Sequence, residues 1–186
     1  MRKQNQSLMR ENKENSEIIN DMNNRLELNE KRTQLAFSKT NRNEQYSRKT
    51  NIKFLGLPES KEETPLEVIN EALNDVGISI VQENIAAIHR IPGQKDQPKP
   101  ILVKLRSIEE KTRIMRKRAE IKSLQKGWKI MDDVTKENAL LIKKLNQDER
   151  ISAAWYYNGY VYGQCGTKRI KFDISDDVDR KIRNKR

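Results

Sequence analysis

The sequence contains few of the residues that build catalytic or metal sites. Of its 186 residues, 34% are hydrophobic and 5% aromatic, and there is one cysteine and one histidine. Cys165 alone excludes a disulfide within the chain, and Cys165 with His89 cannot assemble a zinc site. We therefore predict no metal, no other cofactor and a reducing, intracellular compartment.

Long apolar runs are also missing. No stretch approaches the length of a transmembrane helix, and the first residues lack the apolar segment of a signal peptide. We expect no transmembrane segment. The apolar share is too small for one compact body of this length, so we expect an elongated polar helix beside modest folded parts.

Basic residues outnumber acidic residues, 38 to 27. The net charge is +11, the pI is about 9.7, and 35% of residues are charged. This balance favours polyanionic partners, either nucleic acid or an anionic membrane surface. A solvated basic surface without a partner is the alternative.

Residues 1–46 contain no glycine or proline and predict a polar coiled coil. Positions spaced alternately three and four residues apart can be followed from Asn5 to Asn43, and they include Thr33 and Thr40; we call this row the seam. The apolar residues of the seam are Leu8, Ile19, Met22, Leu26 and Ala36. We predict that these five residues mediate oligomerisation and that partner helices order the arm. A disordered polar tail is the alternative.

Residues 47–132 predict a small α+β domain with the order βαββαβ, the ferredoxin-like arrangement of RNA-recognition-motif domains. Strands are expected near 51–57, 85–91, 101–105 and 127–131. One helix follows Thr64-Pro65, with its apolar stripe on Leu66, Ile69, Leu73 and Val76. A second should begin after Ser107 and run to about Lys122.

Residues 133–186 predict a third unit, also α+β. Thr135 caps a helix that places Leu140, Leu141 and Leu145 inside. Asn158-Gly159 between aromatic and β-branched residues predicts a hairpin with a type I′ turn. A short strand at 169–172 and a final short helix complete the unit.

Motifs for catalysis are lacking. The sequence has no P-loop, no G-x-G-x-x-G and no paired histidine or cysteine ligands. Its acidic pairs, such as Glu109-Glu110, are adjacent, so their side chains diverge. We predict no catalytic residue, no small-molecule substrate and no enzymatic activity.

Positive charge is segregated within residues 47–132. Residues 51–83 carry two Lys or Arg against seven Asp or Glu, whereas residues 84–132 carry thirteen against five. A one-sided positive face is typical of a surface that follows phosphates. The candidate nucleic-acid contacts in this domain are Arg90, Lys99, Lys104, Arg106, Arg113, Arg116, Arg118 and Lys129.

Aromatic residues distinguish the two folded units. The first expected sheet would present Lys53, Pro100 and Leu102 where RNA-recognition motifs carry stacking aromatics, so base-specific stacking is not expected there. The third unit instead places Trp155, Tyr156, Tyr157, Tyr160 and Tyr162 near cations. Some of these rings must be core; the candidate contacts are Tyr157, Tyr160, Lys168 and Arg169.

Several motifs in order resemble a known family. Glu44–Ser60, Ile88–Gly93 and Pro98–Leu105 resemble the first open-reading-frame protein of LINE-type non-LTR retrotransposons. Trp128 through the hairpin to Phe172 resembles that family's C-terminal domain, and still more that of the baculovirus few-polyhedra (FP) protein. The resemblance covers roughly residues 40–175.

The resemblance implies a homotrimer that coats single-stranded RNA or DNA and acts as a nucleic-acid chaperone within a cytoplasmic or nuclear ribonucleoprotein. It implies RNA contact at Arg116 most directly, and at Arg106, Arg113 and Arg118 with less support. The alternative is a few-polyhedra-like structural or adaptor protein that acts through protein contacts.

Overall fold

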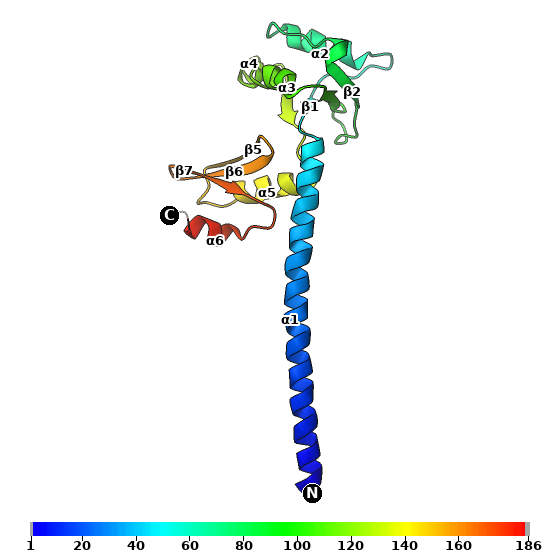
Figure 1. The fold of residues 1–186 in the computed structure, drawn as a ribbon. Coiled ribbons are helices and arrows are strands. Elements are labelled where there is room, and N and C mark those ends of the chain that lie inside the picture. The colour runs from blue at the N-terminus through cyan, green and yellow to red at the C-terminus, as the bar shows by residue number, and fades with distance from the viewer. Residues whose placement is uncertain (1, 185–186) are drawn as a thin grey trace.

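The computed structural model describes residues 2–184 and is an α+β structure (Figure 1). One long N-terminal helix leads into two antiparallel sheets, each with its own helices. The two sheets belong to separate hydrophobic cores. Within these described residues, no helix combines the length and hydropathy needed to cross a membrane.

Helix α1 (Arg2–Ser47) forms the long arm. At 1.5 Å per residue it is roughly 70 Å long, and most of it projects away from the folded units in Figure 1. The predicted oligomerisation residues Leu8, Ile19, Met22 and Leu26 are 53–61% exposed. In the single chain these apolar side chains therefore have no core to enter.

The first unit contains a four-stranded sheet in the order β2-β3-β1-β4, with every neighbouring pair antiparallel. Its strands are β1 (Asn51–Leu55), β2 (Ile85–Arg90), β3 (Ile101–Leu105) and β4 (Lys129–Asp132). Helix α2 (Pro65–Asn74) follows β1, a 3₁₀ turn η1 (Gln82–Asn84) precedes β2, and α3 (Ile108–Met115) and α4 (Arg118–Ser123) follow β3.

Alternation along the strands places the first core on one face of this sheet. Ile52 and Phe54 of β1, Val103 of β3 and Ile130 of β4 are at most 1% exposed. The predicted stripe of α2 is confirmed, because Ile69 and Leu73 are fully buried, Val76 is nearly so, and Leu66 packs against the cluster. Thr64 occupies the N-cap position of α2 but makes no side-chain capping bond.

The single helix predicted from Ser107 to about Lys122 is wrong in one respect: the structure divides it. Ser107 accepts the capping bond from the Glu110 amide at 3.1 Å, as predicted, but α3 ends at Met115 and α4 begins at Arg118. No glycine or proline lies at the break. Ile114 and Ile121 are both buried in the first core, but residues seven apart share one face of an uninterrupted helix as well, so their burial does not explain the break.

The C-terminal unit contains a three-stranded sheet in the order β5-β6-β7. Its elements are α5 (Lys136–Asn146), β5 (Ala153–Tyr157), β6 (Tyr160–Cys165), β7 (Lys168–Phe172) and α6 (Val178–Arg183). Asn158 and Gly159 have φ of 46° and 89°, which confirms the predicted type I′ turn.

The second core lies between this sheet and its helices. Leu141 and Leu145 of α5 pack with Val161, Ile170 and Phe172 of the sheet and with Ile182 of α6. The prediction that Leu140 lies inside is wrong, since that side chain is 51% exposed. Helical spacing explains the error: Leu141 and Leu145 are four residues apart and share a face, whereas Leu140 is turned 100° away.

Candidate nucleic-acid interface

A buried polar joint connects the C-terminal turns of α1 to the start of α5. Asn41 accepts a bond from the Thr135 hydroxyl at 2.7 Å and donates to Asn138 Oδ1 at 3.0 Å. The Gln45 amide oxygen accepts from the Thr135 backbone N–H and from the Asn138 amide, both at 2.9 Å. The four residues are buried, so the end of α1 is ordered within its own chain and does not need partner helices there.

Asp133, in the segment between β4 and α5, extends this joint to β1. Its side chain is 4% exposed and accepts from Asn51 at 2.9 Å, from Arg48 at 3.1 Å and from Lys53 at 2.6 Å. Burial by itself raises the pKa of Asp133, but the hydrogen bonds from Lys53 and Asn51 and the charges of Lys53 and Arg48 outweigh it. The pKa of Asp133 therefore lies below its ordinary value, and the carboxylate remains charged.

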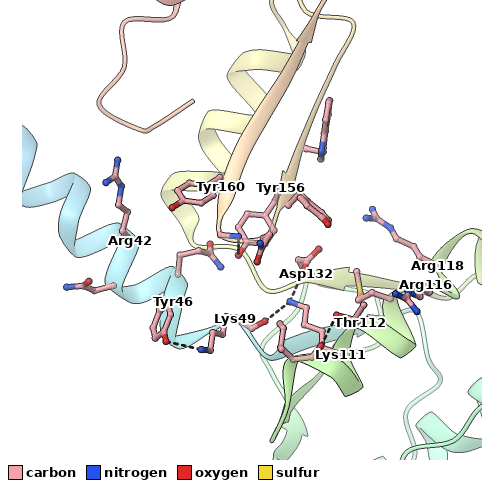
Figure 2. A pocket seen from close by; sticks show the side chains of 18 residues that line it. Arg42, Tyr46, Lys49, Lys111, Thr112, Arg116, Arg118, Asp132, Tyr156 and Tyr160 are labelled. Atoms are coloured by element: carbon pink, nitrogen blue, oxygen red, sulfur yellow. Dashed lines mark hydrogen bonds and ion pairs between the residues drawn. The ribbon is translucent and has the colours of Figure 1, made fainter. Parts of the chain in front are cut away.

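Next to this joint, a cleft of about 1180 Å³ opens between the two folded units (Figure 2). Its walls come from four places: the end of α1, helix α3 with the start of α4, the last residue of β4, and the β5–β6 hairpin. Figure 2 shows Arg116 and Arg118 on one side and Tyr156 and Tyr160 on the hairpin. Residues more than a hundred positions apart therefore line one site.

The cleft carries an excess of positive charge. Its cationic residues are Arg42, Lys49, Lys111, Arg116 and Arg118, and its one carboxylate is Asp132. Asp132 is already paired with Lys111 Nζ at 2.6 Å. Among the described residues no carboxylate lies within ion-pair distance of Arg116 or Arg118, so their guanidinium groups are free to bind an anion.

Aromatic rings border the same cleft. They are Tyr46 of α1 and Trp155, Tyr156, Tyr157 and Tyr160 of the hairpin. Tyr46, Tyr157 and Tyr160 are 68%, 60% and 40% exposed. Burial and then the charge of Asp132 raise the pKa of Tyr156, which keeps its hydroxyl neutral. Exposed rings beside free guanidinium groups are the components of a surface for single-stranded nucleic acid.

Four of the predicted contact residues meet in this cleft. Arg116 and Arg118 come from the first unit, and Tyr157 and Tyr160 come from the C-terminal unit. Arg169, also predicted, lies on the neighbouring strand β7 with its guanidinium 5.5 Å from the Tyr157 ring.

Three predicted cations are instead engaged in internal ion pairs. Arg90 is 12% exposed at its side chain and holds Glu63 at 2.6 Å. It also donates to the carbonyl oxygens of Leu57, Pro58 and Lys99, which ties β2 to the segment after β1. Lys99 pairs with Glu59 at 3.2 Å, and Arg113 pairs with Glu110 at 2.6 Å. We assign Arg90 a structural role.

The remaining predicted cations lie outside the cleft. Lys104 is exposed on the open face of the first sheet, Lys129 on edge strand β4, and Arg106 just beyond β3. Lys168 begins β7, is exposed and has an interaction partner of its own.

The sequence prediction missed the contribution of α1. Arg42 and Tyr46 line the cleft from positions four residues apart on one face of α1, and Lys49 lines it from the turn that follows the helix. That spacing was visible in the sequence. What it could not show is which unit the face meets, because the contact depends on the fold of residues 133–173.

Neither a protein-family model nor a curated protein sequence matches this chain. Across residues 2–184, no three His, Cys, Asp or Glu side chains converge in a way that would hold a metal ion. The candidate interface therefore depends on the geometry and charge of the cleft.

Proposed function

We propose that this protein binds single-stranded nucleic acid without catalysing a reaction and that it does so in the cleft between its two folded units. The observation that carries the proposal is the pairing pattern: Arg116 and Arg118 face the cleft with no carboxylate of residues 2–184 in ion-pair distance, while Asp132 is paired with Lys111. Unpaired cations of this kind bind phosphates, and bases can stack on the tyrosines that border the cleft.

The arrangement of the first unit supports a ferredoxin-like, RNA-recognition-motif-like domain. The element order from β1 to β4, with α3 and α4 together in the place of one helix, and the strand order β2-β3-β1-β4 are those expected for it. Its open sheet face has Lys53 opposite Leu102 and Met131, and Leu102 opposite His89. The described part of that row holds no Phe, Tyr or Trp, and its one ring is the imidazole of His89, which favours phosphate contact over base readout.

The chain associates with itself through α1 in this proposal, as a homotrimer. The seam positions Ala36, Thr40 and Asn43 lie on a different face of α1 from Ser38, Asn41 and Gln45, which are buried against the C-terminal unit. Coiled-coil packing along the seam therefore does not compete with the polar joint. The assembled protein is a chaperone of an intracellular, retrotransposon-type ribonucleoprotein.

Salt dependence of binding tests the nucleic-acid part of the proposal. Arg116→Ala with Arg118→Ala should weaken binding to unrelated single-stranded RNAs alike. Removing one phosphate-binding cation flattens the log–log salt slope by about 0.7, so the double variant should flatten it by roughly 1.4. Arg10→Ala with Lys13→Ala is the matched control, because it removes the same charge from exposed positions of α1 off the seam. Equal slopes in both variants would refute the cleft as the binding site.

Sedimentation tests the self-association. Ile19→Asp with Leu26→Asp places charge at two seam positions and should convert the oligomer to a monomer. The exposed neighbours Glu17 and Arg25, changed to Gln, provide a control that should leave the assembly intact. A wild-type protein that sediments as a monomer at tens of micromolar would contradict self-association.

A further inference from the structure

The sheet of the C-terminal unit has one face that its own helices do not cover. Val161, Ile170 and Phe172 point into the second core with α5 and α6. Strand alternation and the pairing register place the other set on the opposite face. That set is Ala153, Trp155, Tyr157, Tyr160, Tyr162, Gln164, Arg169 and Lys171, and none of these positions carries a carboxylate.

On this face the side chain of Arg169 lies among three rings. Its guanidinium carbon is 3.8 Å from the centroid of Tyr162 and 5.5 Å from those of Trp155 and Tyr157. Trp155 and Tyr162 are stacked, with centroids 6.2 Å apart and planes 24° from parallel. Lys171 Nζ lies 3.0 Å from the Tyr160 centroid. Cation–π attraction therefore holds a planar cation against the rings in advance of any ligand.

The same face borders the cleft. Trp155, Tyr157 and Tyr160 belong to the cleft wall, whereas Tyr162, Arg169 and Lys171 line a second hollow beside β7. Arg42 of α1 lines both and is paired with Asp173 at 2.8 Å; Asp173 and Asp176 also line the second hollow. A single-stranded nucleic acid that extends from the cleft past the hairpin would contact Trp155 and then Arg169. Along this sheet face it would meet no acidic side chain.

We propose that Trp155, Tyr162 and Arg169 form a stacking platform that selects unpaired bases over duplex. The proposal rests on nucleic-acid binding in the cleft and adds the feature of the ligand that is recognised there. Bases stack on aromatic rings and on guanidinium planes, and a duplex keeps its base faces occupied. A guanidinium backed by Tyr162 offers such a plane and a positive charge together. A lysine at the same place would offer only the charge.

Arg169→Lys is the variant that separates these two contributions, because it keeps the charge and removes the plane. Affinity for a single-stranded RNA should fall about tenfold, within the range expected when one base no longer stacks, with an unchanged salt slope. Affinity for a duplex of the same sequence should not change. Arg180→Lys, an exposed arginine on α6, is the matched control and should leave both affinities as in the wild type.

Trp155 supplies a second readout in the wild-type chain. The other tryptophan, Trp128, is 7% exposed in the first core, so a ligand that stacks on the platform should quench the fluorescence of Trp155. Single-stranded RNA should quench strongly and duplex weakly. Thermal melting of each variant separates a loss of binding from a loss of folding.

The possible results distinguish a failure of the platform from a failure of nucleic-acid binding in the cleft. Single-strand binding that persists in Arg169→Lys at wild-type strength, with no quenching of Trp155, would overturn the platform while the cleft stands. Absence of single-strand binding by the wild-type protein would overturn both. An equal loss for single strand and duplex in Arg169→Lys would overturn base selection, because it would assign the guanidinium to a contact that both ligands offer, such as a phosphate.

Discussion

The two sheets of this protein differ in what they present to solvent. The open face of the four-stranded sheet has Lys53, Leu102 and Met131 across its centre. The free face of the three-stranded sheet has rings and cations, with Arg169 set among Trp155 and Tyr162. Among the described residues, the open face of the four-stranded sheet thus has no cluster of rings, whereas the free face of the smaller sheet has one. Function follows from side chains at specific positions and not from the topology that supports them.

Removing the exposed rings of the hairpin should have the largest effect on the difference in RNA binding between the two sheets. Tyr157→Ala with Tyr160→Ala should weaken single-stranded RNA binding by about 1–3 kcal/mol for each base that no longer stacks, with little change in the salt slope. Leu102→Ala with Met131→Ala, on the other sheet, should leave affinity unchanged. Fluorescence anisotropy at two salt concentrations measures the RNA affinity of both variants. An equal loss of affinity in the two variants would show that the two sheets do not differ in RNA binding.

Breaking the joint should affect both units at once. Gln45→Ala leaves the buried Thr135 amide and Asn138 side chain without their acceptor and should cost about 1–3 kcal/mol of unfolding free energy. RNA affinity should fall as well, because the cleft has walls from both units. Urea denaturation and binding assays check these effects against Lys39→Gln, an exposed change on the same helix. Unaltered stability would show that the polar bonds do not hold the units together.

Acid should loosen the contact between the C-terminal unit and α1. Burial raises the pKa of Asp173, but hydrogen bonds from Ser38 and Arg42 outweigh it and lower the pKa from 3.8 to about 2. A lowered folded-state pKa stabilises the protein above the unfolded value, and this stabilisation of roughly 2 kcal/mol is lost as the pH falls from about 4 toward 2.

Urea denaturation across this pH range measures the effect. Asp173→Asn should remove part of the wild-type dependence, while Asp21→Asn on the exposed part of α1 should retain all of it. If the unfolding free energies of the wild type and Asp173→Asn fall in parallel with acid, Asp173 is not the source.

Adding one ring to the first sheet should have the smallest effect. Leu102→Tyr places an aromatic on the open face beside the imidazole of His89, yet its other neighbour Lys53 remains paired with Asp133. We expect single-stranded RNA affinity to stay within about twofold of the wild type, because a platform needs several rings and cations together. A gain of tenfold or more would mean that nucleic acid already passes over this sheet.

Local patterns in the sequence predicted most of the elements. Alternation, the Thr64-Pro65 start of α2 and the Asn158-Gly159 turn are short-range signals, and each corresponds to an element of the structure. The break between α3 and α4 was not predictable, because no glycine or proline marks residues 116–117.

The candidate site was predicted only in part, because its residues meet through contacts between segments far apart in the sequence. Charge segregation identified Arg116 and Arg118, and the hairpin motif identified Tyr157 and Tyr160. Charge counting also included Arg90, because a sequence does not show that Glu63 lies within 2.6 Å of it. The part played by Arg42 and Tyr46 required the docking of α1 against the C-terminal unit.

Photochemical crosslinking of a single-stranded RNA to the wild-type protein, followed by mass spectrometry of the peptides, tests the central claim most directly. If single strands bind in the cleft, crosslinks should form in the hairpin, at Trp155, Tyr157 or Tyr160, and in the segment that contains Arg116 and Arg118. Crosslinks confined to β2 and β3 of the four-stranded sheet, around His89 and Leu102, would contradict it.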